Sequence, residues 1–192
     1  MEKVYTSSNP FVKRVHLRRL EIISELVGYD DKELVLDCGC GEGHLLQRLS
    51  GIKFGVDRSD IALERARVRN PSARFSSADI TQLPFEDDFF GIVTCSEVLE
   101  HVPDYRNAIS EILRVTKPGG RMIISVPNER NWTIGRFFML RFPPQLEDHV
   151  NRFKREDLAE AFGFGPKRTI YVPLGLTYQL ALTQIFEFEK PI

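Results

Sequence analysis

Residues 35–43 have the sequence Val35-Leu-Asp-Cys-Gly-Cys-Gly-Glu-Gly43, and this stretch is the strongest indication of the fold. A short apolar run stops in three closely spaced glycines, and a further apolar segment follows at residues 45–49. Uninterrupted apolar runs are typical of buried strands. Glycines let the chain turn sharply and let a ligand approach the main chain, while a following helix offers free N–H groups at its N-terminus. The stretch therefore predicts a strand, a glycine loop that can bind a ligand, and a helix. His44 stands where a sixth-position glycine would complete a dinucleotide fingerprint, which argues against a nicotinamide-dependent dehydrogenase.

A second signal is the acid that ends the next apolar run. Asp57 closes residues 52–57, a short distance along the chain from the glycine loop. A carboxylate at that place can accept both hydrogen bonds of a ribose diol. Together with the loop it predicts an adenosine-type ligand across the first two strands. A tight turn followed by a helix-capping acid is the structural alternative.

Strands and helices alternate along the rest of the chain. This order predicts an α/β protein, a three-layer Rossmann-like sandwich with a mainly parallel seven-stranded sheet and an antiparallel last strand. We expect one domain, residues 1–192, with an N-terminal cover helix in residues 1–30 and a lid insertion at residues 127–153. A glycine-rich turn, Lys117-Pro-Gly-Gly120, is expected to close the helix before the fifth strand. Strands are expected at residues 33–38, 52–57, 73–77, 89–95, 121–126, 169–172 and 183–188, and helices at 10–27, 45–49, 59–68, 105–115, 132–140 and 155–162.

Composition narrows the class of protein. The chain has 192 residues, 42% of them hydrophobic, with 26 Lys+Arg against 27 Asp+Glu, which excludes a disordered chain and a strongly basic nucleic-acid coat. The charge is unevenly spread, because residues 1–20 and 121–155 are basic and residues 30–120 are acidic. This pattern indicates either solvated helix faces or two basic segments that favour an anionic partner.

Cellular location is also addressed by the sequence. Three cysteines and no apolar leader favour a reduced, cytoplasmic protein. The cysteines are interpreted as small buried residues, because no second Cys/His pair stands at zinc spacing. The uncharged residues 169–186 contain Pro173 and Gly175 and are interpreted as strand, turn and strand, so an integral membrane protein is not expected.

The motifs, in their order, resemble one known family. The glycine stretch is followed by Gly55-Val-Asp57, by Ala78-Asp-Ile80 with Leu83-Pro-Phe85, by residues 89–102 ending in Glu100-His-Val102, and by Leu113-Arg-Val-Thr-Lys-Pro-Gly-Gly120. This set resembles the class I S-adenosylmethionine-dependent methyltransferases, in the ubiquinone-biosynthesis-like subfamily, over roughly residues 10–190. The resemblance implies S-adenosylmethionine as cofactor, with S-adenosylhomocysteine as its product.

The resemblance also implies a role for individual residues. Asp37 and the loop residues would hold the methionine end of the cofactor, and Arg19 its carboxylate. Asp57 would bind the ribose, with Arg58 beside it. Asp79 would bind the adenine amino group, with Ile80 against the ring. Cys95 and Ser96, and with them Leu99, would meet the cofactor amino group. The cofactor-binding set is therefore Arg19, Asp37, Gly39, Cys40, Gly41, Gly43, Asp57, Arg58, Asp79, Ile80, Cys95, Ser96 and Leu99.

A base for the acceptor is sought in residues 97–101 and in the lid. Glu97, Glu100 and His101 would share one face if this segment were helical. His149 in the lid resembles the later histidine of small-RNA 2′-O-methyltransferases. These side chains could supply a base, ligate a divalent cation, or have only a structural role. The candidates for a catalytic role are His101, Glu97 and His149. No metal ligand is assigned.

The lid interleaves aromatic and basic side chains, which suit an anionic acceptor. The structural alternative is an amphipathic lid helix that only covers the cofactor. We therefore expect methyl transfer to a small or lipid-linked, anionic acceptor, at oxygen in preference to nitrogen or carbon. A metal-dependent RNA 2′-O-methyltransferase and a catalytically idle cofactor-binding partner subunit are the alternatives, and the oligomeric state is not indicated. The lid residues concerned are Trp132, Phe137, Phe138, Phe142, Arg130, Arg136, Arg141 and Arg152.

Overall fold

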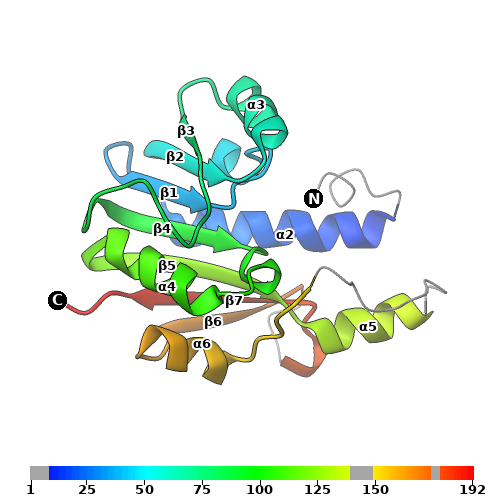
Figure 1. Ribbon diagram of the computed structural model, residues 1–192. Helices are drawn as coiled ribbons and strands as arrows, with labels where there is room; N and C mark the ends of the chain where they lie inside the picture. The colour runs from blue at the N-terminus through cyan, green and yellow to red at the C-terminus, as the bar shows by residue number, and fades with distance from the viewer. Residues whose placement is uncertain (1–8, 139–148, 174–177) are drawn as a thin grey trace.

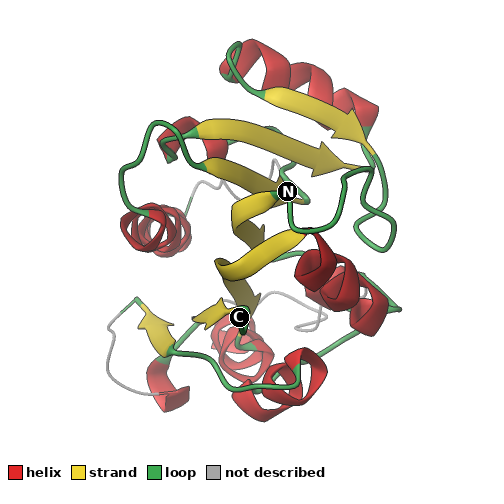
Figure 2. Ribbon diagram, turned by 90° about the vertical axis from the view of Figure 1, so that its left-hand side faces the viewer, coloured by secondary structure: helices red, strands yellow, loops and turns green. Residues whose placement is uncertain are grey.

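The computed structural model describes residues 9–138, 149–173 and 178–192. Its centre is a seven-stranded sheet with the order β3-β2-β1-β4-β5-β7-β6. All neighbouring pairs are parallel except the two that involve β7, which is antiparallel to both β5 and β6. Helices cover both faces of the twisted sheet (Figures 1 and 2), so the three-layer sandwich and its antiparallel last strand are confirmed. The strands are β1 (Leu34–Cys38), β2 (Ile52–Asp57), β3 (Arg74–Ser77), β4 (Phe90–Ser96), β5 (Thr116–Pro127), β6 (Arg168–Val172) and β7 (Thr183–Glu189).

Local sequence signals set the ends of the helices. Asn9 caps the first helix by accepting the Phe11 N–H at 2.9 Å, Pro10 occupies its first turn, and Gly28 ends it. Ser59 likewise accepts the Ala62 N–H at 3.2 Å. The α-helices are α2 (Pro10–Val27), α3 (Asp60–Arg69), α4 (Tyr105–Val115), α5 (Glu129–Phe138) and α6 (Arg155–Phe162), and short 3₁₀ turns form at η1 (Leu46–Arg48), η2 (Leu99–His101) and η3 (Tyr178–Leu180).

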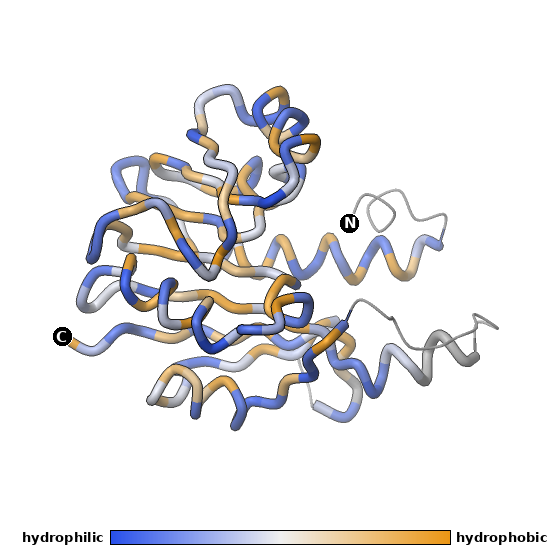
Figure 3. The backbone as a smooth tube through the Cα atoms, in the orientation of Figure 1, coloured by the Kyte–Doolittle hydropathy of each residue, from blue (hydrophilic) through white to orange (hydrophobic). Residues whose placement is uncertain are grey.

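The core consists of two hydrophobic clusters, one on each face of the sheet. Successive side chains of a strand alternate between the faces, so Val35 packs with α2 while Leu36 packs with α4 and α6. In Figure 3 the trace of α2 alternates between hydrophobic and hydrophilic residues, as expected of a helix with one buried face. All three cysteines are buried and unbridged, as the sequence predicted.

The helix expected at residues 132–140 begins earlier, as α5 (Glu129–Phe138), and residues 139 and 140 lie outside the described ranges. Two other expected elements differ in kind from the structure. The predicted helix at residues 45–49 is only the 3₁₀ turn η1, because the chain must leave the glycine loop and enter β2 within a few residues. The predicted turn Lys117-Pro-Gly-Gly120 is part of β5 instead. Lys190 holds it there, because the Gly119 N–H donates to the Lys190 carbonyl and the Lys190 N–H donates to the Gly120 carbonyl, both at 2.9 Å.

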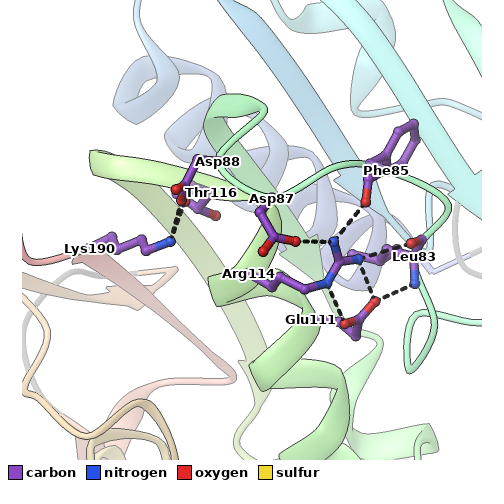
Figure 4. A network of polar contacts seen from close by, with 8 residues as sticks. All are labelled: Leu83, Phe85, Asp87, Asp88, Glu111, Arg114, Thr116 and Lys190. Atoms are coloured by element: carbon purple, nitrogen blue, oxygen red, sulfur yellow. Dashed lines mark hydrogen bonds and ion pairs between the residues drawn. The ribbon is translucent and has the colours of Figure 1, made fainter.

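A polar clamp holds residues 83–88, the segment that leads into β4 (Figure 4). Arg114 at the end of α4 donates to the carbonyls of Phe85 at 2.7 Å and Leu83 at 3.0 Å. The same guanidinium pairs with Asp87 at 2.8 Å and with Glu111 at 2.7 Å. This clamp fixes the path of the chain between Asp79 and β4.

Within the described ranges, no helix is both long enough and apolar enough to cross a membrane.

Candidate functional site

The candidate site lies at the carboxyl ends of the central strands. The strand order reverses between β1 and β4, and ligands of open α/β sheets bind at such a switch point. A pocket of about 420 Å³, counting its open mouth, opens there. Its walls come from α2, the end of β1, the glycine loop and the end of β4. They are formed by Arg19, Leu20, Asp37, Gly39, Cys40, Gly41, Glu42, His44, Leu45 and Ser96.

The glycine loop is folded tightly against β2. The N–H groups of Gly39 and Cys40 both donate to the Val56 carbonyl, at 2.7 and 2.9 Å. Gly39 has a φ of 71°, and a Cβ there would lie 2.4 Å from a methyl group of Val98. Gly41 and Gly43 also have positive φ angles, 52° and 74°. The loop therefore needs its glycines both for conformation and for space.

Asp57 joins the loop to the end of β2. Its Oδ2 accepts the Gly41 N–H at 2.8 Å and its Oδ1 accepts the Ser59 N–H at 2.9 Å. Each carboxylate oxygen keeps a second lone pair, so a diol can still be bound. The same hydrogen bonds also fit the alternative that Asp57 has a structural role, since they order the turn before α3.

The residues expected at the adenine end lie together at the ends of β2 and β3. Arg58 is exposed, and its Nη1 lies 3.8 Å from Oδ2 of Asp79. Thr81 donates both its N–H and its hydroxyl to Oδ1 of Asp79, and the backbone hydrogen bond is the main reason why the pKa of Asp79 is lowered. Ile80 is buried beneath them.

Asp37 is the buried acid of the pocket. The Thr94 hydroxyl donates to its Oδ1 at 2.8 Å. Burial raises the pKa of Asp37 to about 7, and the Arg19 cation acts in the opposite direction. A cation brought into the pocket would therefore bind this carboxylate in its charged form.

Arg19 and Glu97 form a buried ion pair at the same pocket. Arg19 is only 3% exposed, and its Nη1 lies 3.1 Å from Oε2 of Glu97. Ser125 donates to the other carboxylate oxygen at 3.3 Å. Burial raises the pKa of Glu97, and the Arg19 cation opposes this effect.

The predicted common face of Glu97, Glu100 and His101 is wrong. β4 ends at Ser96, Glu97 has a φ of 57°, and only residues 99–101 form a 3₁₀ turn. Glu97 therefore reaches Arg19, and its carboxylate still raises the pKa of Glu100.

Cys95 and Leu99 are both fully buried in the core, and neither is among the residues that line the pocket, so their contact with the cofactor stays a prediction. Ser96 does line the pocket, with its hydroxyl 2.9 Å from that of Ser125.

Glu100, His101 and His149 form a second polar group beside the pocket. One ligand atom from each lies within 4.8 Å of the others. The two imidazole rings meet edge to face, with centroids 4.7 Å apart. Glu100 is 1% exposed, and burial raises its pKa well above the ordinary range. Three such side chains could ligate a divalent cation or handle a proton.

Glu129 belongs to this group, and the sequence analysis missed it. Its Oε1 lies 2.8 Å from Nδ1 of His149. Glu129 stands two residues after the end of β5, at the edge where the other functional side chains gather, and that position was the available signal.

The lid is described only in part. Arg141 and Phe142 lie outside the described residues, as do the side chains of Arg136, Phe137 and Phe138. Arg130 and Arg152 are exposed. Trp132 stacks on His16 of α2.

Comparison with known proteins agrees with this arrangement. The family model described as "Methyltransferase domain" matches residues 36–124. The ubiquinone biosynthesis O-methyltransferase of Shewanella sp. (strain ANA-3) is 30% identical, covering 100% of this chain and 88% of that protein. A Mycolicibacterium smegmatis protein named "Probable S-adenosylmethionine-dependent methyltransferase" is also 30% identical, over 72% of this chain. The chain spans only 54% of that relative.

A solved structure shows the same fold. The N-methyltransferase NodS from Bradyrhizobium japonicum WM9, in complex with S-adenosylhomocysteine, has a TM-score of 0.71 and 20% identity, covering 97% of this chain and 90% of that one. The chain belongs to the class I S-adenosylmethionine-dependent methyltransferases. Within that class it falls among the relatives of the ubiquinone-biosynthesis O-methyltransferases. S-Adenosylmethionine is accordingly its cofactor.

Proposed function

We propose that the chain transfers the methyl group of S-adenosylmethionine to a small or lipid-linked, anionic acceptor, at oxygen in preference to nitrogen or carbon. The observation that carries this proposal is the position of the Glu129–His149 pair, which lies beside a pocket lined by the glycine loop, Asp37 and Arg19. The two sites adjoin at Glu97, because the pKa of this residue is influenced by Arg19 and by His149 and Glu129. The name of the Shewanella relative supports oxygen as the methylated atom.

The pocket has the donors and acceptors that the cofactor needs. Gly39 and Gly41 line the pocket without side chains of their own, so a ligand can approach the main chain of the loop. Asp37 would accept from the ammonium group and Arg19 would bind the carboxylate. Asp57 would accept from the ribose, and Asp79 with Ile80 would meet the adenine. The cofactor supplies a methyl group that its sulfonium already activates, so the protein mainly aligns the reactants and excludes water.

His149 is the best placed base for an acceptor hydroxyl. A carboxylate can only accept, so Nδ1 of His149 donates to Glu129 and Nε2 of a neutral ring is left to take a proton. Glu97 was also a candidate base. Its carboxylate forms an ion pair with Arg19, so it is better suited to positioning Arg19 than to taking a proton from the acceptor. The exposed Arg130 and Arg152 support an anionic acceptor.

The experiment starts with calorimetry of S-adenosylhomocysteine binding to the wild type and to Asp57→Ala. We expect binding by the wild type and a large loss in the variant, and no binding of NAD. The purified chain is then incubated with a radiolabelled methyl donor and matched acceptors, namely phenols with and without a carboxylate or an isoprenoid tail, and the corresponding amines. Preferred labelling of the amines would refute the choice of oxygen. Turnover by the chain alone would exclude the idle-subunit alternative.

A metal-dependent version of the reaction is the second candidate. It is favoured by the grouping of Glu100, His101 and His149, whose chemistry suits a divalent cation. Mn²⁺ binding to the wild type and to His101→Ala tests it, and equal binding or none removes it. A short RNA with a free terminal 2′-hydroxyl, offered with and without Mn²⁺, separates the RNA alternative from small acceptors.

A further inference from the structure

Two acceptors from different parts of the chain share one nitrogen of Arg19. Its Nη1 lies 3.1 Å from Oε2 of Glu97 and 3.2 Å from Nδ1 of His16. His16 lies three residues earlier in α2, on the same side of the helix, and Glu97 follows β4. Nη1 carries two protons, so both contacts can be hydrogen bonds at once. Together they restrict how the guanidinium can turn at the wall of the pocket.

The state of His16 is defined by this contact. Arginine can only donate, so Nδ1 of His16 must accept, which places the ring proton on Nε2. Burial, and secondarily the Arg19 cation, lowers the pKa of His16 to about 3. The ring is therefore neutral near pH 7 and able to accept.

His16 also contacts the lid. Its ring stacks on Trp132 of α5, with centroids 5.9 Å apart and planes inclined by 15°. The start of α5 is anchored, because the Asn128 N–H donates to the Leu182 carbonyl at 2.8 Å and the Trp132 N–H donates to the Asn128 carbonyl at 3.0 Å. α5 also carries Glu129, the partner of His149. One helix thus supports both the histidine beside Arg19 and the histidine of the second polar group.

We propose that His16 is a positioning residue, which aims Arg19 at the cofactor and links the occupied cofactor pocket to α5 through Trp132. The proposal rests on the proposed function, because it requires Arg19 to contact the cofactor. It goes further in giving the chain a physical connection between the cofactor end of the site and the helix that carries Glu129.

Ordinary core packing is the competing explanation for a buried histidine. A phenylalanine would fill the same space and keep the stack on Trp132, but it cannot accept from Arg19. A glutamine keeps an acceptor but loses the stack. His16→Phe and His16→Gln therefore separate packing from positioning, and the exposed Arg18→Gln is the matched control on α2.

The first measurement is S-adenosylhomocysteine binding by calorimetry, with thermal unfolding of each variant. His16→Phe is expected to fold with a modest loss of thermal stability, because a buried N–H of Arg19 loses an acceptor, and to raise the Kd by about 5- to 10-fold, the usual effect of one hydrogen bond to a charged group. His16→Gln should stay within about 3-fold of the wild type, and Arg18→Gln should be unchanged. An unchanged Kd in His16→Phe overturns the positioning role, while wild-type binding that is sensitive to Asp57→Ala leaves the proposed function standing. Failure of the wild type to bind overturns both.

The second measurement uses the fact that Trp132 is the single tryptophan of the chain. S-Adenosylhomocysteine is expected to change its emission in the wild type. In His16→Gln, where the stack is lost, calorimetry should still detect binding while most of the emission change disappears. An emission change of equal size in His16→Gln, or none in a wild type that binds, overturns the link to α5.

Discussion

Oε1 of Glu129 lies 2.8 Å from Nδ1 of His149, and both side chains are nearly buried. The carboxylate fixes the ring so that Nε2 is turned away from Glu129. A carboxylate that accepts a hydrogen bond from one ring nitrogen orients a histidine and makes its other nitrogen a stronger metal ligand or base. The relationship joins the start of α5 to a segment beyond the lid, and Glu100 and His101 complete the group from the end of β4.

Replacing Glu129 should weaken any metal held by this group. We expect Glu129→Ala to lower the affinity for Mn²⁺ by about 10- to 100-fold, because His149 loses its orientation. Glu129→Gln should lose less, since its amide oxygen can still accept from Nδ1. Titration of Mn²⁺ followed by electron paramagnetic resonance measures this, with Glu160→Ala, an exposed carboxylate on α6, as control. Equal affinities in all three variants would contradict the role of Glu129.

Gly39→Ala should destabilise the protein in two ways. Its φ of 71° is costly for alanine, and the new Cβ would lie 2.4 Å from Val98. We expect the free energy of unfolding to fall by about 2 kcal/mol or more, measured by denaturant titration. Gly163→Ala is the matched control, because Gly163 has a φ of 80° with nothing within 4 Å of the added Cβ. It should show only the conformational cost of about 1 kcal/mol. If both variants lose the same amount, the contact with Val98 does not matter.

Asp37 should make both stability and cofactor binding depend on pH. Its pKa is about 7 in the folded protein against an ordinary value of 3.8. A raised pKa means that its favourable contribution is present below about pH 4 and is lost as the pH rises through 7. Relative to Asp37→Asn, the wild type should therefore lose unfolding free energy between about pH 4 and about pH 7.

The same group should tighten S-adenosylhomocysteine binding as the pH rises through about 7, because the ligand ammonium favours ionised Asp37. Calorimetry in buffers of different ionisation enthalpy would show a proton released on binding below that pH. An identical pH profile in Asp37→Asn would assign the effect to another group.

Arg114→Lys should cost stability although it keeps the charge. A lysine cannot reproduce the fork that joins Glu111, Asp87 and two carbonyls, so we expect a loss of about 2 kcal/mol in the free energy of unfolding. Arg106→Lys, in the exposed pair with Glu160, should change little. Equal effects on thermal unfolding would show that the clamp adds nothing to an ordinary surface pair.

Much of the fold follows from local sequence. The bounds of β2, α4 and α6 agree with the expectation. The spacing of their apolar residues and the residues at their ends are local features of the sequence, and these features set the bounds. The two elements that differed, η1 and the start of β5, depend on partners elsewhere. The backbone of Lys190 forms hydrogen bonds with Gly119 and Gly120 and so extends β5 through them, and no local sequence pattern predicts this pairing.

Sequence patterns were enough to predict the sheet, the glycine loop and the acids at strand ends, because parallel strands bring their carboxyl ends to one edge. Which side chains meet at that edge depends on the three-dimensional packing. Glu97 leaves the expected face and binds Arg19, Glu129 reaches His149, and His16 stacks on Trp132. Each pair joins elements far apart in the chain, so its geometry depends on how helices pack against the sheet and on one positive φ after β4, which periodicity does not encode.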